Sequence, residues 1–193
     1  VRPYALEIAE KNAKKAKLAN FLPELIVNSQ KLQFIEAKTK MEQVRRDNPT
    51  LAGICHFTAM DIGFSPQGII DEFYEKKLVL AEQCKQTTGE TVVMIDTRFD
   101  DRVCTAGSRF EKNIFVSDFS HPPLNKPVIK WSVSIGSSTK EGSPSYKHIP
   151  FCTVKAGKIS LTLPGILKPE KMNIKVTVEE GSRHFENNWD YWL

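Results

Sequence analysis

Two polar side chains accompany a nearly apolar run, Leu51–Met60. His56 lies within the run, and Asp61 directly follows its last residue. Such a run, followed by a loop rich in Gly and Pro, predicts a strand buried on both faces. A carboxylate at the end of that strand can hydrogen-bond a substrate or orient a catalytic group; it can also simply cap a helix or stabilise the loop. A histidine within a strand is more often a core residue with one hydrogen bond. We take Asp61 and His56 as the candidate substrate-binding residues.

The remaining histidines show no catalytic or metal-binding spacing. His121, His148 and His184 lie far apart in the second half of the chain and form no HxxxH pattern. Cys152 follows His148 closely, but a Cys-His nucleophilic pair needs a thiol of low pKa and a third group that orients the histidine. The residues therefore predict no metal and no cofactor.

The four cysteines, Cys55, Cys84, Cys104 and Cys152, are widely spaced and none forms a CxxC pair. This spacing argues against a zinc site. Cys55 in the apolar run and Cys84 in a helical pattern are predicted to be buried free thiols. Cys104 and Cys152 both fall among predicted strands, so a disulfide between them stays open for an oxidising compartment.

The aromatic residues have two interpretations: a platform on which a ligand stacks, or ordinary packing residues. Trp131 alternates with Val133 on an apolar strand face, which favours the core. Trp189 and Trp192 are three positions apart and point to opposite faces of a regular strand. We predict that one of them lies in the core and that the other packs elsewhere.

The composition is that of a globular protein, with 193 residues, 40% hydrophobic and 26% charged, and a net charge of +4. No apolar run approaches the roughly 20 residues of a membrane span. The densest lysines, at 11–17, lie on a predicted helix without interleaved aromatic residues, so we read them as a solvated face. We expect neither a nucleic acid nor a membrane as partner.

The first half of the chain reads as helical around the apolar run. One helix opens at Pro3, and a second runs from about Pro23 to Arg46 and ends before Pro49. A third covers Leu78–Gln86 and ends near Gly89.

From Thr91 onward the apolar period changes from helical to two, which predicts antiparallel strands with one apolar face each. Two packed sheets are the economical solution for such strands. The turn-rich segment Gly136–Ser145 is predicted to be a flexible loop. The strand patterns lie at residues 92–95, 110–116, 128–135, 159–163 and 172–179.

The order of several segments resembles the end of the catalytic barrel, and the domain that follows it, in family-two glycoside hydrolases of the β-galactosidase-like kind. No single segment is as specific as a catalytic signature, and the order of the segments is the stronger argument. The last segment is similar to an Asn-x-Trp-x-x-Trp run near the end of the following immunoglobulin-like domain. The segments are residues 28–33, 40–46, 51–53, Asp61 with 67–73, and 185–192.

The resemblance implies an α+β chain in two parts. Residues 1–89 would be the last helices and the eighth strand of an incomplete (β/α)8 barrel, and residues 90–193 an immunoglobulin-like β-sandwich. In such a barrel the carboxyl ends of the strands face the active site, which is where Asp61 would lie.

The parent enzyme would hydrolyse β-linked glycosides with retention, using two carboxylates about 5 Å apart. In the family these are glutamates at the ends of the fourth and seventh strands, and no position here matches them. We therefore expect a catalytically silent fragment that lacks parts of the parent on both sides. Its partners would be the rest of the parent chain and the parent's carbohydrate substrate, in the periplasm or outside the cell.

Two other hypotheses remain open. A non-catalytic carbohydrate-binding or adhesion sandwich would expose a row of aromatic side chains and bind glycans. A complete small hydrolase using Asp61 and His56 would need a pocket built from one strand and a few helices. The fragment hypothesis instead predicts exposed apolar surface on the N-terminal half, through which the isolated chain could also form a homodimer.

Overall fold

The computed structural model describes residues 4–51, 53–55, 59–62, 67–77 and 81–193. The chain divides into two compact units. The first comprises residues 1–37 and 55–83, and the second comprises residues 38–54 and 84–193. The long helix α2 contributes to both units, and its last turns belong to the second.

The predicted helices are confirmed in the described residues. They are α1 (Tyr4–Lys15), a 3-10 turn (Ala19–Phe21), α2 (Leu22–Asp47) and α3 (Ala81–Thr88). Asn48-Pro49 follows the last residue of α2, where proline disfavours the helical conformation of the residue before it. Gly89 follows α3, and its amide donates to the carbonyl of Lys85 at 3.1 Å.

The predicted strand Leu51–Met60 is wrong for the part that the structure describes. Its described residues form no strand, and the contact recorded there is an isolated bridge between Met60 and Ile70. Ile54 is 39% exposed and Cys55 is also exposed, so the prediction of a buried Cys55 thiol is wrong as well. A strand buried on both faces needs neighbouring strands to pair its backbone groups, and none of the described strands pairs with this run.

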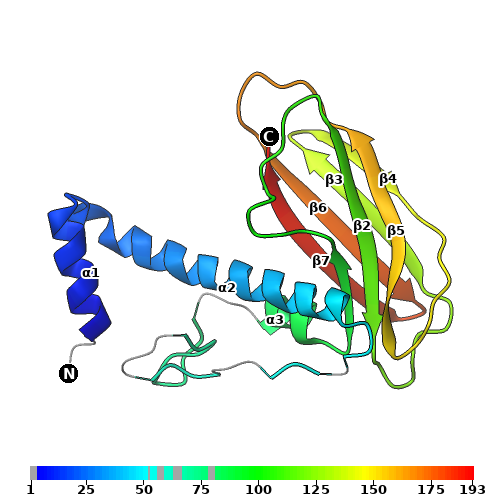
Figure 1. The fold of residues 1–193 in the computed structure, drawn as a ribbon, viewed down its shortest axis with the longest axis horizontal. Helices are drawn as coiled ribbons and strands as arrows, with labels where there is room; N and C mark the ends of the chain where they lie inside the picture. Colours follow the sequence, from blue (N-terminus) through cyan, green and yellow to red (C-terminus); the bar gives the residue numbers. More distant parts are fainter. Residues whose placement is uncertain (1–3, 52, 56–58, 63–66, 78–80) are drawn as a thin grey trace. The chain divides into compact units, whose positions relative to one another are not determined.

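The second unit is a sandwich of two antiparallel sheets, drawn in green to red in Figure 1. One sheet has the order β1-β2-β5 and the other β4-β3-β6-β7. The strands are β1 (Thr91–Ile95), β2 (Arg109–Asp118), β3 (Val128–Ile135), β4 (Ser138–Gly142), β5 (Cys152–Thr162), β6 (Lys171–Glu180) and β7 (Arg183–Trp192).

The expectation of a flexible loop at Gly136–Ser145 is wrong, because β4 lies within it. Ile135 pairs with Ser138 across a tight turn, and Gly136 adopts a φ of 54°, which glycine takes without strain. Four of the five β4 side chains are exposed. An edge strand of this kind has no apolar alternation that could reveal it in the sequence.

The core lies between the two sheets and consists of side chains that alternate along the strands. The rings of Phe110 and Tyr191 meet edge to face at 5.4 Å between centroids. Trp189 is 1% exposed and Trp192 51%, which confirms that the two tryptophans point to opposite faces.

Candidate functional site

A dense cluster of buried polar side chains joins the last turns of α2 to β7. Lys38 and Glu42 lie one helical turn apart on α2, and Asn187 and Trp189 lie two residues apart on the inward face of β7. The Lys38 Nζ donates to Glu42 Oε1 at 2.6 Å and to Asn187 Oδ1 at 2.5 Å. The Trp189 Nε1 donates to Glu42 Oε2 at 2.9 Å. We call these four residues the α2–β7 cluster.

Water has almost no access to the α2–β7 cluster. Lys38 is 5% exposed, Glu42 and Asn187 are fully buried, and Trp189 is 1% exposed. Burial lowers the pKa of Lys38, and the neighbouring Glu42 carboxylate opposes that effect. The Lys38 Nζ also lies 4.5 Å from the centre of the Trp189 ring, a cation–π contact.

The Asn187 amide is held from both sides. Its Oδ1 accepts the Lys38 ammonium and also the Asn188 backbone amide at 2.9 Å. Its Nδ2 donates to Glu42 Oε1 at 3.0 Å and to the Val93 carbonyl at 2.8 Å. The amide therefore has one fixed orientation, with its oxygen toward the lysine and its nitrogen toward the carboxylate.

Two arginines at the end of α2 extend this attachment to the strands. The Arg45 guanidinium donates to Ser117 Oγ at 3.1 Å and to the Gly89 carbonyl at 2.9 Å, and burial lowers its pKa. Arg46 donates to the Ile95 carbonyl at 2.8 Å. Cations at a helix C-terminus also interact favourably with the helix dipole, so both residues stabilise the docked end of α2.

A second buried cluster surrounds Asp118 at the end of β2. Its Oδ1 accepts from Thr91 Oγ1 at 2.9 Å and from Ser120 Oγ at 2.6 Å. Its Oδ2 accepts from the Leu124 amide at 2.8 Å and lies 3.0 Å from His148 Nε2. Burial alone would raise the pKa of Asp118, but the hydrogen bonds from Ser120, Leu124 and Thr91 together hold it below its ordinary value.

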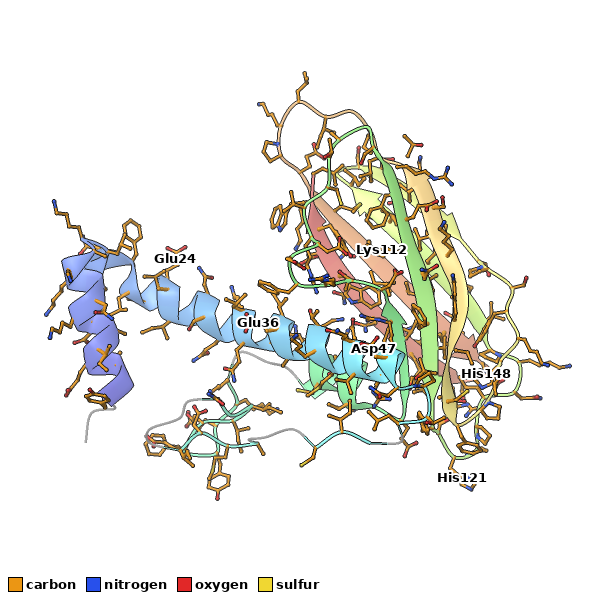
Figure 2. All side chains as sticks on the ribbon, in the orientation of Figure 1. Glu24, Glu36, Asp47, Lys112, His121 and His148 are labelled. Carbon is orange, nitrogen blue, oxygen red and sulfur yellow. The ribbon has the colours of Figure 1, made fainter. Side chains whose placement is uncertain are left out.

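The Asp118 cluster does not form a nucleophilic site. The Cys152 thiol donates to the Ile149 carbonyl at 3.4 Å, and burial with the nearby Asp118 raises its pKa. The other ring nitrogen of His148 lies 3.4 Å from the Tyr146 hydroxyl. In Figure 2, His148 lies toward the same end of the sandwich as His121 and away from Lys112. A thiol of raised pKa is a poor nucleophile. We therefore assign the cluster a structural role, in which the contact between His148 and Asp118 fixes the segment before β5.

The first unit holds Asp61 in a structural arrangement. Its Oδ1 accepts from the Gly68 amide at 2.7 Å and from the Lys77 ammonium at 2.7 Å. The Gln33 side chain donates to the Gln67 carbonyl at 2.7 Å and so ties the same loop to α2. His56 lies outside the described residues, so whether the two predicted site residues meet stays a prediction.

Within the described part of the chain, no group of three or more His, Cys, Asp or Glu side chains is placed to hold a metal ion. Cys104 and Cys152 are both free. No described helix is long and apolar enough to cross a membrane.

A shallow hollow of about 480 Å³ opens on the four-stranded sheet. Trp131 is half-buried against the core, and a side chain on Gly142 would meet its ring at 2.5 Å. Lys175 pairs with Glu186 at 2.6 Å at the side of the hollow. The lining residues are Lys130, Trp131, Ser132, Glu141, Gly142, Ser143, Lys175 and Thr177.

Comparisons with known proteins give one family match and weak structural neighbours. Residues 108–193 match a domain of unknown function, DUF8488. A search of curated proteins gives no match. A structure of β-glucuronidase from Parabacteroides merdae with glycerol in its active site aligns with a TM-score of 0.32 and 11% identity, over 52% of this chain and 13% of the enzyme's chain. A second structure of that enzyme aligns with the same TM-score and identity, over 53% of this chain and 13% of its own.

The sequence alone did not single out Lys38, Glu42 or Asn187. A usable signal was present in β7, where Asn187 occupies the inward-facing register between Phe185 and Trp189. A polar residue in that register must find buried hydrogen-bond partners. Lys38 and Glu42 form the corresponding signal in the helix. They are an ion pair at i, i+4, and such a pair on the inward-packing face of a helix indicates buried polar partners.

Proposed function

We propose that this chain is a non-catalytic part of a glycoside hydrolase, in which the β-sandwich anchors the end of a helix from the catalytic domain. The sequence resemblance to family-two glycoside hydrolases supports the enzyme class. The observation that carries the anchoring role is the distribution of buried residues along α2. All of them lie in its last turns: Lys38, Thr39, Met41, Glu42 and Arg45.

The earlier part of α2 supports the same proposal. Residues 22–37 contain no buried side chain, although several of them are large and apolar. Leu25, Val27 and Leu32 are 45%, 40% and 43% exposed. Apolar surface of this extent on a helix is characteristic of an interaction surface. In the proposed parent enzyme, the remaining strands and helices of the barrel would cover it.

The proposed chemistry belongs to the parent enzyme. A retaining glycosidase needs a nucleophilic carboxylate and an acid/base carboxylate flanking the scissile bond. The chain offers no residue at a position matching either glutamate of the family, so we propose that it supplies support and, through Asp61, at most a contact to a β-linked sugar. We place the parent enzyme in the periplasm or outside the cell.

The first experiment is to sequence the reading frame on both sides of the segment in its source. Several hundred upstream residues with strand–helix alternation and two strand-end glutamates are expected. The product of that whole frame should then hydrolyse chromogenic β-glycosides, and residues 1–193 alone should not. A start codon directly before Val1, or hydrolysis by residues 1–193 alone, would overturn the proposal.

The hollow on the four-stranded sheet favours a second candidate function, a non-catalytic carbohydrate-binding module. The hydroxyl and charged groups of Ser132, Thr177, Lys130 and Lys175 that line the hollow can hydrogen-bond sugar hydroxyls. Titration calorimetry with soluble oligosaccharides tests this candidate. Lys175→Ala should weaken binding, whereas Lys171→Ala, which breaks the ion pair with Asp190 outside the hollow, should not. Equal effects of the two substitutions would exclude the hollow as the site.

A further inference from the structure

The α2–β7 cluster places three reactive groups in mutual contact. The Lys38 amine touches the Asn187 amide at 2.5 Å from Oδ1, and Glu42 Oε1 touches both partners, at 2.6 Å from Lys38 Nζ and 3.0 Å from Asn187 Nδ2. From this geometry we propose that Lys38 and Asn187 form an intramolecular amide bond, with Glu42 carrying the protons. The proposal concerns the chain itself and does not depend on the proposed glycosidase parent.

Lysine must lose a proton before it can act as a nucleophile. Desolvation favours the neutral amine, and burial does lower the pKa of Lys38. Glu42 is the base in reach, because its Oε1 already accepts a hydrogen bond from Lys38 Nζ. Transfer of one proton along that bond gives a neutral amine beside a neutral carboxylic acid, which a buried site accommodates better than two separate charges.

The hydrogen bonds of the Asn187 amide would support attack at its carbon. The Asn188 backbone N–H donates to Oδ1 at 2.9 Å and remains there as that oxygen gains negative charge. Preorganised donors of this kind stabilise the tetrahedral intermediate of acyl transfer. The departing nitrogen, Nδ2, faces Glu42 Oε1 and can take the proton that the carboxyl group received from Lys38.

The reaction balances without an oxidant or a co-reactant. The Lys38 Nζ–Asn187 Cγ bond forms, and the Cγ–Nδ2 bond breaks. Glu42 accepts a proton from Nζ and delivers one to Nδ2, and the second amine proton leaves by the same path. The products are a secondary amide and one ammonium ion, which carries both protons lost by Nζ, and Glu42 ends as the carboxylate that it was at the start.

The fold supplies the conditions that this chemistry needs. Holding the amine and the amide together replaces an encounter in solution by an intramolecular step. Trp189, 1% exposed, lies against the Lys38 ammonium and helps to exclude the water that would compete for the acyl carbon. The product would join two positions 149 residues apart and fix the last turns of α2 to the last strand of the sandwich.

Intact-mass spectrometry of the denatured chain tests the bond directly. The folded chain is expected to weigh less than its sequence by one ammonia. Trypsin should then release a branched peptide that joins Leu32–Lys40 to His184–Leu193, because an acylated Lys38 is no longer cleaved. A full sequence mass in the folded fraction, identified by its circular dichroism, would overturn the proposal.

Two variants and one control separate this bond from other losses of ammonia. Glu42→Gln and Lys38→Arg should restore the full sequence mass. Lys40→Arg, which changes an exposed lysine on the same helix, should leave the loss of ammonia unchanged. A cyclic imide formed at Asn187 alone would also release ammonia, but it gives no branched peptide and survives Lys38→Arg. That result would equally overturn the proposal.

Discussion

Replacing Glu42 by leucine should destabilise the second unit more than any comparable change on the surface of α2. Glu42 is fully buried and accepts hydrogen bonds from Lys38, Asn187 and Trp189. Glu42→Leu leaves the Lys38 ammonium buried without its carboxylate, a change that costs about 3–5 kcal/mol. The free energy of unfolding of a typical domain is about 5–15 kcal/mol, so the variant should lose a large part of it.

Urea unfolding followed by tryptophan fluorescence measures this loss, because Trp189 is buried beside Glu42. The matched control is Glu36→Leu, which makes the same change at an exposed position of α2 (Figure 2) and should shift the free energy by about 0.5 kcal/mol or less. Intact mass is recorded first for each protein, because a Lys38–Asn187 bond would add its own stabilisation to the parent.

A double variant tests the reasoning more strictly. Lys38→Met combined with Glu42→Leu removes both charges, and replacing a whole buried ion pair by apolar residues is often nearly neutral. The double variant should therefore be more stable than Glu42→Leu alone. If Glu42→Leu costs no more than Glu36→Leu, or if the double variant loses the sum of the two single losses, the buried ion pair does not stabilise this contact.

Three further outcomes can be checked on the same protein. Hydrogen bonds hold the pKa of Asp118 below its ordinary value of 3.8. The Asp118 carboxylate therefore contributes its full stabilisation above that pH and loses it as the pH falls through the lowered pKa. Asp118→Asn should flatten this part of the acid-unfolding curve. Gly142→Ala should cost about 1–3 kcal/mol in urea unfolding, because its Cβ would meet the Trp131 ring at 2.5 Å, whereas Gly165→Ala, with open space around it, should cost nothing. A thiol reagent added to the folded chain should modify the exposed Cys55 first, because burial raises the thiol pKa of the other three cysteines; equal rates would contradict the described burial.

The period of the apolar residues predicted most of the sandwich. In β3 and β6, inward-facing apolar side chains alternate with polar ones, so the strands follow from the sequence, and their single apolar faces indicate that they belong to packed sheets. The helices followed from their stop signals, with Pro49 after α2 and Gly89 after α3. These features are local, and a single sequence contains them.

The failures come from contacts that are not local. The run Leu51–Met60 is apolar enough for a buried strand, but a strand exists only where other strands pair with it, and none does so in the described residues. The prediction for β4 was wrong in the opposite direction, because a loop was expected where a strand forms. Pairing with β3 holds β4 in place, although the side chains of β4 are mostly exposed.

In the α2–β7 cluster, a non-local contact of this kind is detectable in the sequences of both elements that form it. In β7 the inward register would be wholly apolar if the sandwich closed on itself, but Asn187 interrupts it and is nevertheless fully buried. A buried amide needs donors and acceptors that a sheet interior does not supply. Lys38 and Glu42 supply them from a helix whose other side chains stay at least partly exposed until that point in the chain. A polar residue in the core-facing register of a terminal strand therefore indicates that another element docks there, and it identifies the face on which to search for it.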